Sequence, residues 1–473
     1  MFRLDEMIRA LTGKKLISKD YSFSEAVVDS RLAAEGVLFA AMPGERTDGH
    51  KFISAAFEKG ARAALVQEDV TGDFDVIDLR NRQSDVTADI MKKPVCFRVE
   101  NTLAALQKTA AYHRAQLPKM EVLGITGSVG KTSTKELIYE VLSRHYRTLK
   151  TAGNMNNEIG LPLTLLHADE ETEQAVLEMG FYVPGEIDLL CQIASPSVGV
   201  ITNIGMVHAS RAGSMEVIAR GKSELVQALP SGGTAILNYD DPYVRRMADV
   251  TKADVFYYGL DPAADLFADN IESFGLEGVR FDLNCGGEKH TVKIPLVGQH
   301  SVLTALRAAA VGLVKKLSWD EITAGLEQGQ NNLRMRIGKT ENGGTLIDDS
   351  YNSSPDAALA ALNLLAEMKG RRVAVLGDML ELGQYEKIGH EKVGKRAGEI
   401  ADVLVLAGPL CRHMMDAAIA GGMPQENVFW FETAADSVDF VRENYGGAGD
   451  VILVKGSLGM KMKQIVSALE GKE

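Results

Sequence analysis

A glycine-rich segment at residues 124–133 has the residue types and spacing of a phosphate-binding loop. It reads Gly-Ile-Thr-Gly-Ser-Val-Gly-Lys-Thr-Ser, with glycines at 124, 127 and 130. The strict pattern with four residues between two glycines is not met, because position 125 is isoleucine. A strand pattern precedes the loop and a helical pattern begins at the lysine, so backbone N–H groups and the helix N-terminus would point at one anion.

This segment predicts a nucleotide site. Lys131 would reach the β- and γ-phosphates of ATP, and the Thr132 hydroxyl would hold Mg²⁺. The nucleotide-binding residues that we expect are Gly127, Ser128, Val129, Gly130, Lys131, Thr132 and Ser133. The alternative is a structural glycine turn followed by an incidental lysine–threonine pair.

The elements that must position this loop fall into three predicted domains. The 473 residues exceed what one hydrophobic core usually holds. Residues 1–99 show short apolar runs between turns, and a helical stretch at 102–116 reads as a connector. Residues 100–331 and 332–473 alternate strand and helix patterns, which indicates parallel βαβ units. We therefore predict an α/β protein with a small N-terminal α/β domain, a central phosphate-loop domain with a parallel sheet, and a doubly wound, Rossmann-like C-terminal domain.

The most specific part of that prediction is a set of strands and helices. In the central domain the strands are expected at residues 121–126, 174–179, 197–202 and 234–238, with a helix at 131–144. In the C-terminal domain they are expected at 344–347, 372–376, 403–406 and 451–454, with a helix at 356–368.

Composition excludes several classes of protein. The formal net charge of -13 argues against a nucleic-acid partner, which would need clustered Lys and Arg. The four cysteines lie far apart and indicate neither a disulfide framework nor a zinc site. No signal peptide and no membrane span are recognisable, so we expect a cytoplasmic protein. We separately expect a monomer.

Further segments resemble the Mur ligase family in order and spacing over essentially the whole chain. The motifs are GSVGKTSTKE from Gly127, GNMNNEIGLPLTL from Gly153, Glu178-Met179-Gly180, Thr202-Asn203-Ile204-Gly205 with His208, Lys222-Ser223-Glu224, Asp348-Asp349-Ser350-Tyr351-Asn352, GDMLELG from Gly377, and Lys455-Gly456-Ser457. Asp29-Ser30-Arg31 and residues 44–52 resemble the uridine-nucleotide-binding domain of the same family.

The resemblance implies an ATP-dependent ligase of peptidoglycan precursor synthesis. Within the family, the motifs are most similar to the enzymes that join D-alanyl-D-alanine to UDP-N-acetylmuramoyl-tripeptide. A substrate carboxylate would attack the γ-phosphate of ATP to give an acyl phosphate, and an amine would then displace phosphate. Both steps bring negative groups together, so the site must supply positive charge and metal.

The resemblance assigns Mg²⁺ ligands to Thr132, Glu178, His208 and Lys222. Lys222 would carry a carbamate formed with carbon dioxide, which needs a neutral amine and therefore a lowered lysine pKa. Lys131, Lys222, His208 and Arg334 are the implied catalytic residues. Without the resemblance, Glu178 is a solvated acid at a strand end, His208 an ordinary loop residue and Lys222 one of many surface lysines.

The remaining site residues are also implied by resemblance. Arg334 would contact the transferred phosphoryl group and Asp349 the nucleotide, both on domain closure, which would exclude water. Asn352 would lie on the dipeptide side. Asn154, Asn156, Asn157 and Glu158 would form a floor for the tripeptide, and Ser30 and Arg31 would bind the nucleotide-sugar diphosphate. The alternatives are a surface salt bridge for Arg334, a turn-forming acid for Asp349 and a capped loop for residues 154–158.

The chain departs from the family pattern at three places. After Gly298-Gln299-His300 the family usually has two asparagines, three residues apart, and here Ser301 and Thr304 replace them. Hydroxyl groups cannot present the paired donor and acceptor of an amide to adenine. Ser353 and Ser354 follow Asn352 where a second asparagine is usual. Adenine selectivity and dipeptide affinity are the properties that these changes affect.

Three other functions fit parts of the sequence. The ligase that adds the third amino acid shares the mechanism but should differ in the loop at residues 348–352. A folate-polyglutamate ligase shares the central and C-terminal domains, but this function would leave the first hundred residues without a role. A non-catalytic relative that binds precursor or protein partners is motivated by Ser301 and Thr304. Nothing resembles the partner motifs of kinases or transport ATPases.

Overall fold

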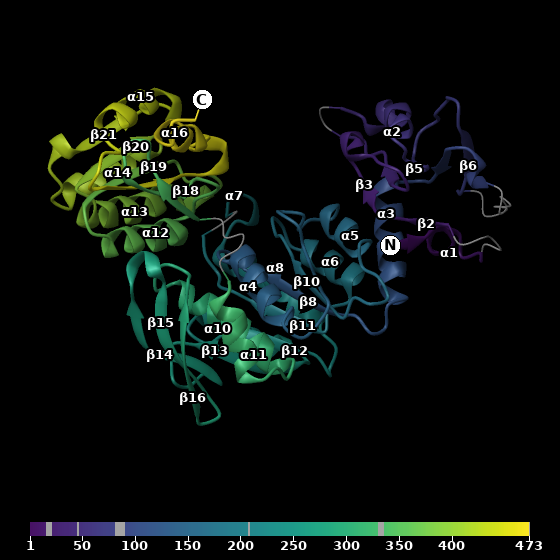
Figure 1. Ribbon diagram of the computed structural model, residues 1–473, viewed down its shortest axis with the longest axis horizontal. Coiled ribbons are helices and arrows are strands. Elements are labelled where there is room, and N and C mark those ends of the chain that lie inside the picture. Colours follow the sequence, from purple (N-terminus) through teal and green to yellow (C-terminus); the bar gives the residue numbers. More distant parts are fainter. Residues whose placement is uncertain (16–20, 45–46, 81–89, 207–208, 330–334, 473) are drawn as a thin grey trace.

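The computed structural model describes residues 1–15, 21–44, 47–80, 90–206, 209–329 and 335–472. Figure 1 shows an N-terminal lobe in purple and a C-terminal lobe in green to yellow, on opposite sides of a central lobe. Each of the three large sheets lies within one predicted range, 1–99, 100–331 or 332–473. The three-domain α/β architecture is confirmed, and the boundaries stay a proposal.

The N-terminal domain is a five-stranded parallel sheet with a small two-stranded antiparallel sheet beside it. In spatial order the strands are β3 (Ala26–Val27), β4 (Leu38–Ala40), β5 (Ala63–Val66), β7 (Val95–Arg98) and β6 (Asp75–Asp78). The small sheet pairs β1 (Phe2–Arg3) with β2 (Ser22–Phe23), with α1 (Leu4–Thr12) between them in the chain. Helix α2 (Ile53–Glu58) packs on the larger sheet. The predicted connector is α3 (Thr102–Ala115), which begins after the N-cap Asn101.

The central domain is built on a nine-stranded sheet. In spatial order its strands are β16 (Glu288–Ile294), β15 (Val279–Cys285), β14 (Leu266–Ser273), β13 (Asp254–Gly259), β12 (Thr234–Asn238), β11 (Val198–Ile201), β8 (Glu121–Thr126), β10 (Gln174–Glu178) and β9 (Thr148–Lys150). The strands from β9 to β14 pair in parallel, whereas β14, β15 and β16 are antiparallel. The predicted parallel strands are confirmed, and the antiparallel extension was not anticipated.

Helices cover both faces of this sheet, as a buried parallel sheet requires. The helices are α4 (Lys131–Leu142), α5 (Gly160–Leu165), α6 (Glu186–Ala194), α7 (Ala209–Ala212), α8 (Met215–Ala228), α9 (Pro242–Arg245), α10 (Ser301–Val314) and α11 (Trp319–Glu327). One core lies between the sheet and α4, α10 and α11, and the other contains α6 and α8 and continues into the N-terminal domain. The phosphate loop connects β8, in the interior of the sheet, to α4.

The C-terminal domain is doubly wound, as predicted. Its strands in spatial order are β17 (Arg336–Lys339), β18 (Thr345–Asp349), β22 (Asp450–Lys455), β19 (Arg371–Gly377), β20 (Val403–Ala407) and β21 (Val428–Phe431), with β17 antiparallel. One core contains α12 (Pro355–Glu367), α13 (Glu386–Ile400) and α14 (Cys411–Ala420); the other contains α15 (Ala434–Asn444) and α16 (Lys463–Leu469). Loops at the carboxyl ends of the parallel strands form the usual ligand-binding edge of such a sheet.

One of the contacts between the C-terminal domain and the central domain is made by two short segments, 209–213 and 381–385, which we call the latch. The N–H of Ser210 donates to the backbone oxygen of Glu381 (3.1 Å), and Gln384 Nε2 donates to that of Gly213 (2.9 Å). A Cβ at Gly383 would lie 2.8 Å from Ser210 Cα, so the close approach requires glycine. Figure 1 shows α7, which carries this contact, beside the C-terminal lobe.

Among the described residues, the helices are too short or too polar to cross a bilayer.

Candidate active site

The phosphate loop is held open by its own backbone and by the end of β11. Gly127 and Gly130 have φ of 144° and 86°, and a Cβ at Gly127 would collide with the Thr202 hydroxyl. The Asn203 side chain accepts from the N–H of Val129 and donates to the backbone oxygen of the same residue, each at 3.0 Å. Gly130 caps α4 without a side-chain hydrogen bond, so the helix presents its N–H groups to an anion.

Glu178 contacts the loop through Thr132. The Thr132 hydroxyl donates to Glu178 Oε2 at 2.9 Å, and the carboxylate, at the end of β10, is fully buried. Asn156 Nδ2 donates to the other oxygen, Oε1, at 2.9 Å. Glu178 is therefore not the solvated strand-end acid that was the alternative. A hydroxyl and a carboxylate side by side are hard oxygen donors of the type that Mg²⁺ prefers.

Lys131 and Lys222 converge on one backbone oxygen. Lys131 Nζ donates to the backbone oxygen of Gly127 at 2.7 Å, and Lys222 Nζ donates to the same atom at 3.0 Å. Lys222, on α8, is 2% exposed, so the surface-lysine alternative is wrong. Its ammonium lies 4.8 Å from the centre of the Phe181 ring. Burial, and then the nearby charge of Lys131, lower the pKa of Lys222 well below its usual value.

The C-terminal domain faces the loop across a cavity of about 190 Å³. Asp349, at the end of β18, pairs with Lys455 at 2.6 Å, and Lys455 Nζ also donates to the backbone oxygen of Asn352 at 2.8 Å. The cavity is lined by residues 128–133, by His300 and Thr304, and by Asp349, Tyr351–Ser354, Ala357, Ala360, Ala361, Met335 and Lys455. The structure thus places Asp349 and Asn352 opposite the phosphate loop.

A larger cavity, about 1040 Å³, adjoins the first one and shares Thr132, Met335 and Tyr351 with it. Asn154 lines this cavity. Asn157 and Glu158 instead line a smaller cavity of about 100 Å³ that also contains Tyr182. Asn157 Oδ1 accepts from the N–H of Gly160 at 2.9 Å, in keeping with the capped-loop alternative.

The two residues predicted to bind the nucleotide sugar are not brought to the loop. Ser30 and Arg31 lie in the N-terminal domain, where Arg31 is largely exposed and pairs with Asp29 at 2.7 Å. The Arg31 guanidinium donates to the Asp29 carboxylate and thereby lowers the pKa of Asp29 to about 2, and the carboxylate in turn raises the pKa of Arg31. His208 and Arg334 lie outside the described residues.

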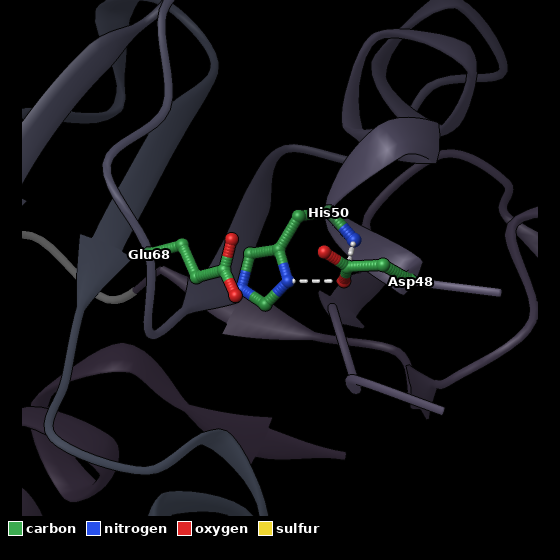
Figure 2. A group of neighbouring side chains, drawn as sticks. All are labelled: Asp48, His50 and Glu68. Atoms are coloured by element: carbon green, nitrogen blue, oxygen red, sulfur yellow. Dashed lines mark hydrogen bonds and ion pairs between the residues drawn. The ribbon is translucent and has the colours of Figure 1, made fainter. Parts of the chain in front are cut away.

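A group of three potential metal ligands occurs in the N-terminal domain. The ligand atoms of Asp48, His50 and Glu68 lie within 4.8 Å of one another, and Figure 2 shows the imidazole between the two carboxylates. His50 Nε2 accepts from the N–H of Gln67 at 3.0 Å, and Nδ1 lies 2.6 Å from Asp48 Oδ1. Both ring nitrogens are therefore used within the protein, which leaves no lone pair for a metal. The group fixes the end of β5 to the turn at Asp48.

Asn156, which was expected with its neighbours to form the floor for the tripeptide, is the asparagine that contacts Glu178, and nothing in the spacing of the three asparagines distinguishes it. One residue near the site was not selected from the sequence. Arg307, on α10, has its guanidinium against Gly130. Its position seven residues after His300, on the same face of a helix, is the signal that could have found it.

Comparisons with known proteins agree with this geometry. The Mur ligase middle domain matches residues 125–312, the Mur ligase glutamate ligase domain 333–458, and the Mur ligase family catalytic domain 25–114. The chain is 35% identical over 445 residues to the UDP-N-acetylmuramoyl-tripeptide–D-alanyl-D-alanine ligase of Bacillus subtilis, covering 93% of this chain and 92% of that protein. It is 33% identical to the ligase of the same name from Escherichia coli, covering 99% and 98%.

Solved structures give the same result. A crystal structure of MurF from Acinetobacter baumannii superposes with a TM-score of 0.84 at 29% identity, covering 99% of this chain and 98% of that one. MurF ligase from Thermotoga maritima in complex with ADP gives a TM-score of 0.79 at 26% identity, covering 96% and 99%. With relatives of more than 30% identity along nearly its full length, the chain belongs to the Mur ligase family.

Proposed function

We propose that this chain is an ATP-dependent ligase that joins D-alanyl-D-alanine to UDP-N-acetylmuramoyl-tripeptide through an acyl phosphate, in peptidoglycan precursor synthesis. Its products would be the amide, ADP and phosphate. The observation that carries the proposal is the convergence of Lys131, Lys222 and the Thr132–Glu178 pair on one glycine turn. The names of the relatives of matching length support the choice of substrates.

The binding step follows from the loop. The N–H groups at the start of α4 would hold the β- and γ-phosphates, and Lys131 Nζ would exchange the Gly127 oxygen for a phosphate oxygen. Asp349 would hold the nucleotide from the C-terminal domain, and Arg334 would contact the transferred group. Ser30 and Arg31 would bind the diphosphate of the nucleotide sugar. Asn154, Asn157 and Glu158 would lie along the tripeptide, and Asn352 near the dipeptide.

The donor set near Thr132 fits Mg²⁺. Thr132 and Glu178 supply oxygen atoms, and we propose His208 and a carbamate on Lys222 as the other ligands. The carbamate fits the observed burial, because a buried lysine with a lowered pKa has the neutral amine that attacks carbon dioxide. Bound there, Mg²⁺ would neutralise the charge that builds up as the carboxylate approaches the γ-phosphate.

The role of the surrounding chain is to orient the reactants and exclude water. The substrate carboxylate must lie in line with the γ-phosphate, and the dipeptide amine must then reach the acyl carbon. Docking of the C-terminal domain over the loop would keep water from hydrolysing the acyl phosphate. A monomeric state and a cytoplasmic location are part of this proposal.

Phosphate release tests the proposed function. The purified chain is mixed with ATP, Mg²⁺, D-alanyl-D-alanine and UDP-N-acetylmuramoyl-tripeptide, with either lysine or diaminopimelate as the third residue. We expect release only when both substrates are present, together with a product heavier by one dipeptide less water. L-Alanyl-L-alanine and the Lys131→Met variant are the controls. Nucleotide-sugar binding with no turnover on either tripeptide would contradict the proposal and favour a non-catalytic relative.

A further inference from the structure

Arg307 is a buried cation directly behind the phosphate loop. It lies on α10 and is 3% exposed. A Cβ built on Gly130 would lie 3.1 Å from Arg307 Nη1, so the guanidinium packs against the glycine turn itself. Gly130 is the last loop residue before Lys131, whose N–H and side chain are expected to meet the phosphates. Gly130 therefore lies between the Arg307 guanidinium and the proposed phosphate site.

The hydrogen bonds of this guanidinium go to neutral groups. Nη1 donates to the Thr134 hydroxyl at 2.5 Å, and Nε donates to the Tyr258 hydroxyl at 3.0 Å. In the part of the chain that the structure describes, no carboxylate forms an ion pair with Arg307. A guanidinium stays charged at every physiological pH. Burying such a charge without a counter-ion is costly, so a role in packing alone is a poor explanation for it.

The charges around the loop are unbalanced in the same direction. Lys131 contacts Gly127 and Arg307 packs against Gly130, whereas the buried carboxylate of Glu178 contacts the loop through Thr132. Two cations therefore face one carboxylate at the glycine turn, and Lys222 does not add to this positive charge because burial lowers its pKa. A diphosphate or triphosphate bound at the loop supplies the missing negative charge.

Arg307 also continues the helix face that meets the nucleotide cavity. His300 and Thr304 line that cavity, and Arg307 follows Thr304 by three residues on the same side of α10. Ser301, at the first of the two positions where the family usually has asparagine, donates its hydroxyl to the backbone oxygen of Val297 at 2.6 Å. That hydroxyl is engaged by the segment that precedes α10, so this face contributes charge through Arg307 rather than an amide through Ser301.

We propose that Arg307 is a positioning residue for the nucleotide: its fixed charge, buried against Gly130, is neutralised by the nucleotide phosphates and strengthens their binding. This inference rests on the proposed function insofar as the loop must bind ATP. Arg307 does not touch the reacting atoms. It acts through the loop, by holding the turn and by adding to its positive potential.

The test compares ADP binding, measured by calorimetry with Mg²⁺ present, in the full-length protein and its variants. Arg307→Met removes the charge but keeps a side chain of similar length, Arg307→Lys keeps the charge, and Arg307→Gln keeps hydrogen-bond donors without charge. At an effective dielectric constant of about 20, a unit charge several ångströms from a phosphate changes affinity by about tenfold or more. We expect that loss for Met and Gln, and an affinity near wild type for Lys.

A matched control comes from Arg114, on α3. It is partly buried and donates to backbone oxygens, of Ala194 at 3.2 Å and Leu117 at 3.1 Å, but it lies in the connector between domains. Arg114→Met should bind ADP like wild type. Thermal unfolding without nucleotide shows which variants are folded. If Arg307→Met is not folded, the ADP affinities of Arg307→Gln and Arg307→Lys are compared instead, because these two variants differ in charge.

Two results would overturn the inference. One is an ADP affinity for Arg307→Met or Arg307→Gln within about twofold of wild type, which means that the charge does not contribute. The other is a loss in Arg307→Lys as large as in the neutral variants, which means that packing, not charge, matters. If the wild-type chain itself bound no ADP, the proposed function would fail, and that outcome is distinct from both.

Discussion

Lys222 Nζ, on α8, donates to the backbone oxygen of Gly127 at 3.0 Å, although 95 positions separate the two residues in the chain. The same oxygen accepts from Lys131. Two amines therefore meet at a single atom of the phosphate loop, one next to the loop in sequence and one brought there by the fold. The buried one has the lowered pKa that carbamate formation needs.

Replacing Lys222 by arginine should abolish ligation and leave the fold intact. A guanidinium remains protonated and cannot form a carbamate, so a proposed oxygen ligand of Mg²⁺ is lost. We expect phosphate release to fall by at least about 100-fold, as for loss of a metal ligand. Steady-state kinetics measures the change, and circular dichroism checks the fold. Wild-type turnover in a folded Lys222→Arg protein would rule out the carbamate.

Glu178→Gln tests the second proposed ligand. The amide has nearly the same shape but no charge, and it offers Mg²⁺ a much weaker oxygen. We expect turnover to fall by about 10- to 100-fold and the Mg²⁺ concentration for half-maximal rate to rise. Glu121→Gln is the control: Glu121 is the first residue of β8, whereas Glu178 is the last residue of the neighbouring parallel strand β10. This change should leave the Mg²⁺ dependence unchanged. An unchanged Mg²⁺ requirement in Glu178→Gln would contradict the assignment.

Gly383→Ala should separate the two halves of the latch. Its added Cβ would lie 2.8 Å from Ser210 Cα, so the two segments must move apart to accommodate it. We expect ATP turnover to fall by about tenfold, with the radius of gyration in small-angle scattering larger in the presence of ADP. Gly286→Ala is the matched control, because Gly286 has a similar φ (59° against 54°) and nothing within 4 Å. Equal effects from the two changes would show that backbone strain, not the interface, is responsible.

His390 should make the C-terminal domain less stable in acid. Its Nε2 accepts from the N–H of Met379 at 3.0 Å, which only the neutral ring can do. Burial lowers the pKa of His390 below the usual 6.5, so the unfolded chain takes up a proton before the folded one does. The contribution of His390 is therefore complete above about pH 6.5 and is lost as the pH falls from there to the lowered pKa.

Chemical denaturation between pH 7.5 and 5 measures this effect. Within the window the free energy of unfolding should fall by at most about 1.4 kcal/mol per pH unit from this one group. His390→Gln should show a shallower decline than the wild type. Parallel curves for His390→Gln and wild type would mean that His390 does not titrate in this range.

The local patterns of the sequence determined much of this protein. Strand β8, the glycine turn and α4 were all predictable, because a strand, a turn and a helix that follow one another depend on near neighbours in the chain. The alternation of strands and helices likewise predicted the doubly wound C-terminal sheet, since parallel strands need crossover connections. The half-exposed antiparallel strands β14–β16 escaped this reasoning. Lys222 and Glu178 were identified only through family resemblance, and their roles stay proposals.

The tertiary structure decided which polar side chains are buried together. Nothing local distinguishes Lys222 from a surface lysine, or Asn156 from Asn154 and Asn157, because burial depends on which elements pack against a residue. The charge of Arg307 acquires its significance only when α10 packs against α4 and sets it behind Gly130. Contacts between residues far apart in sequence fix desolvation and electrostatic potential, and these physical quantities cannot be read from the order of residues alone.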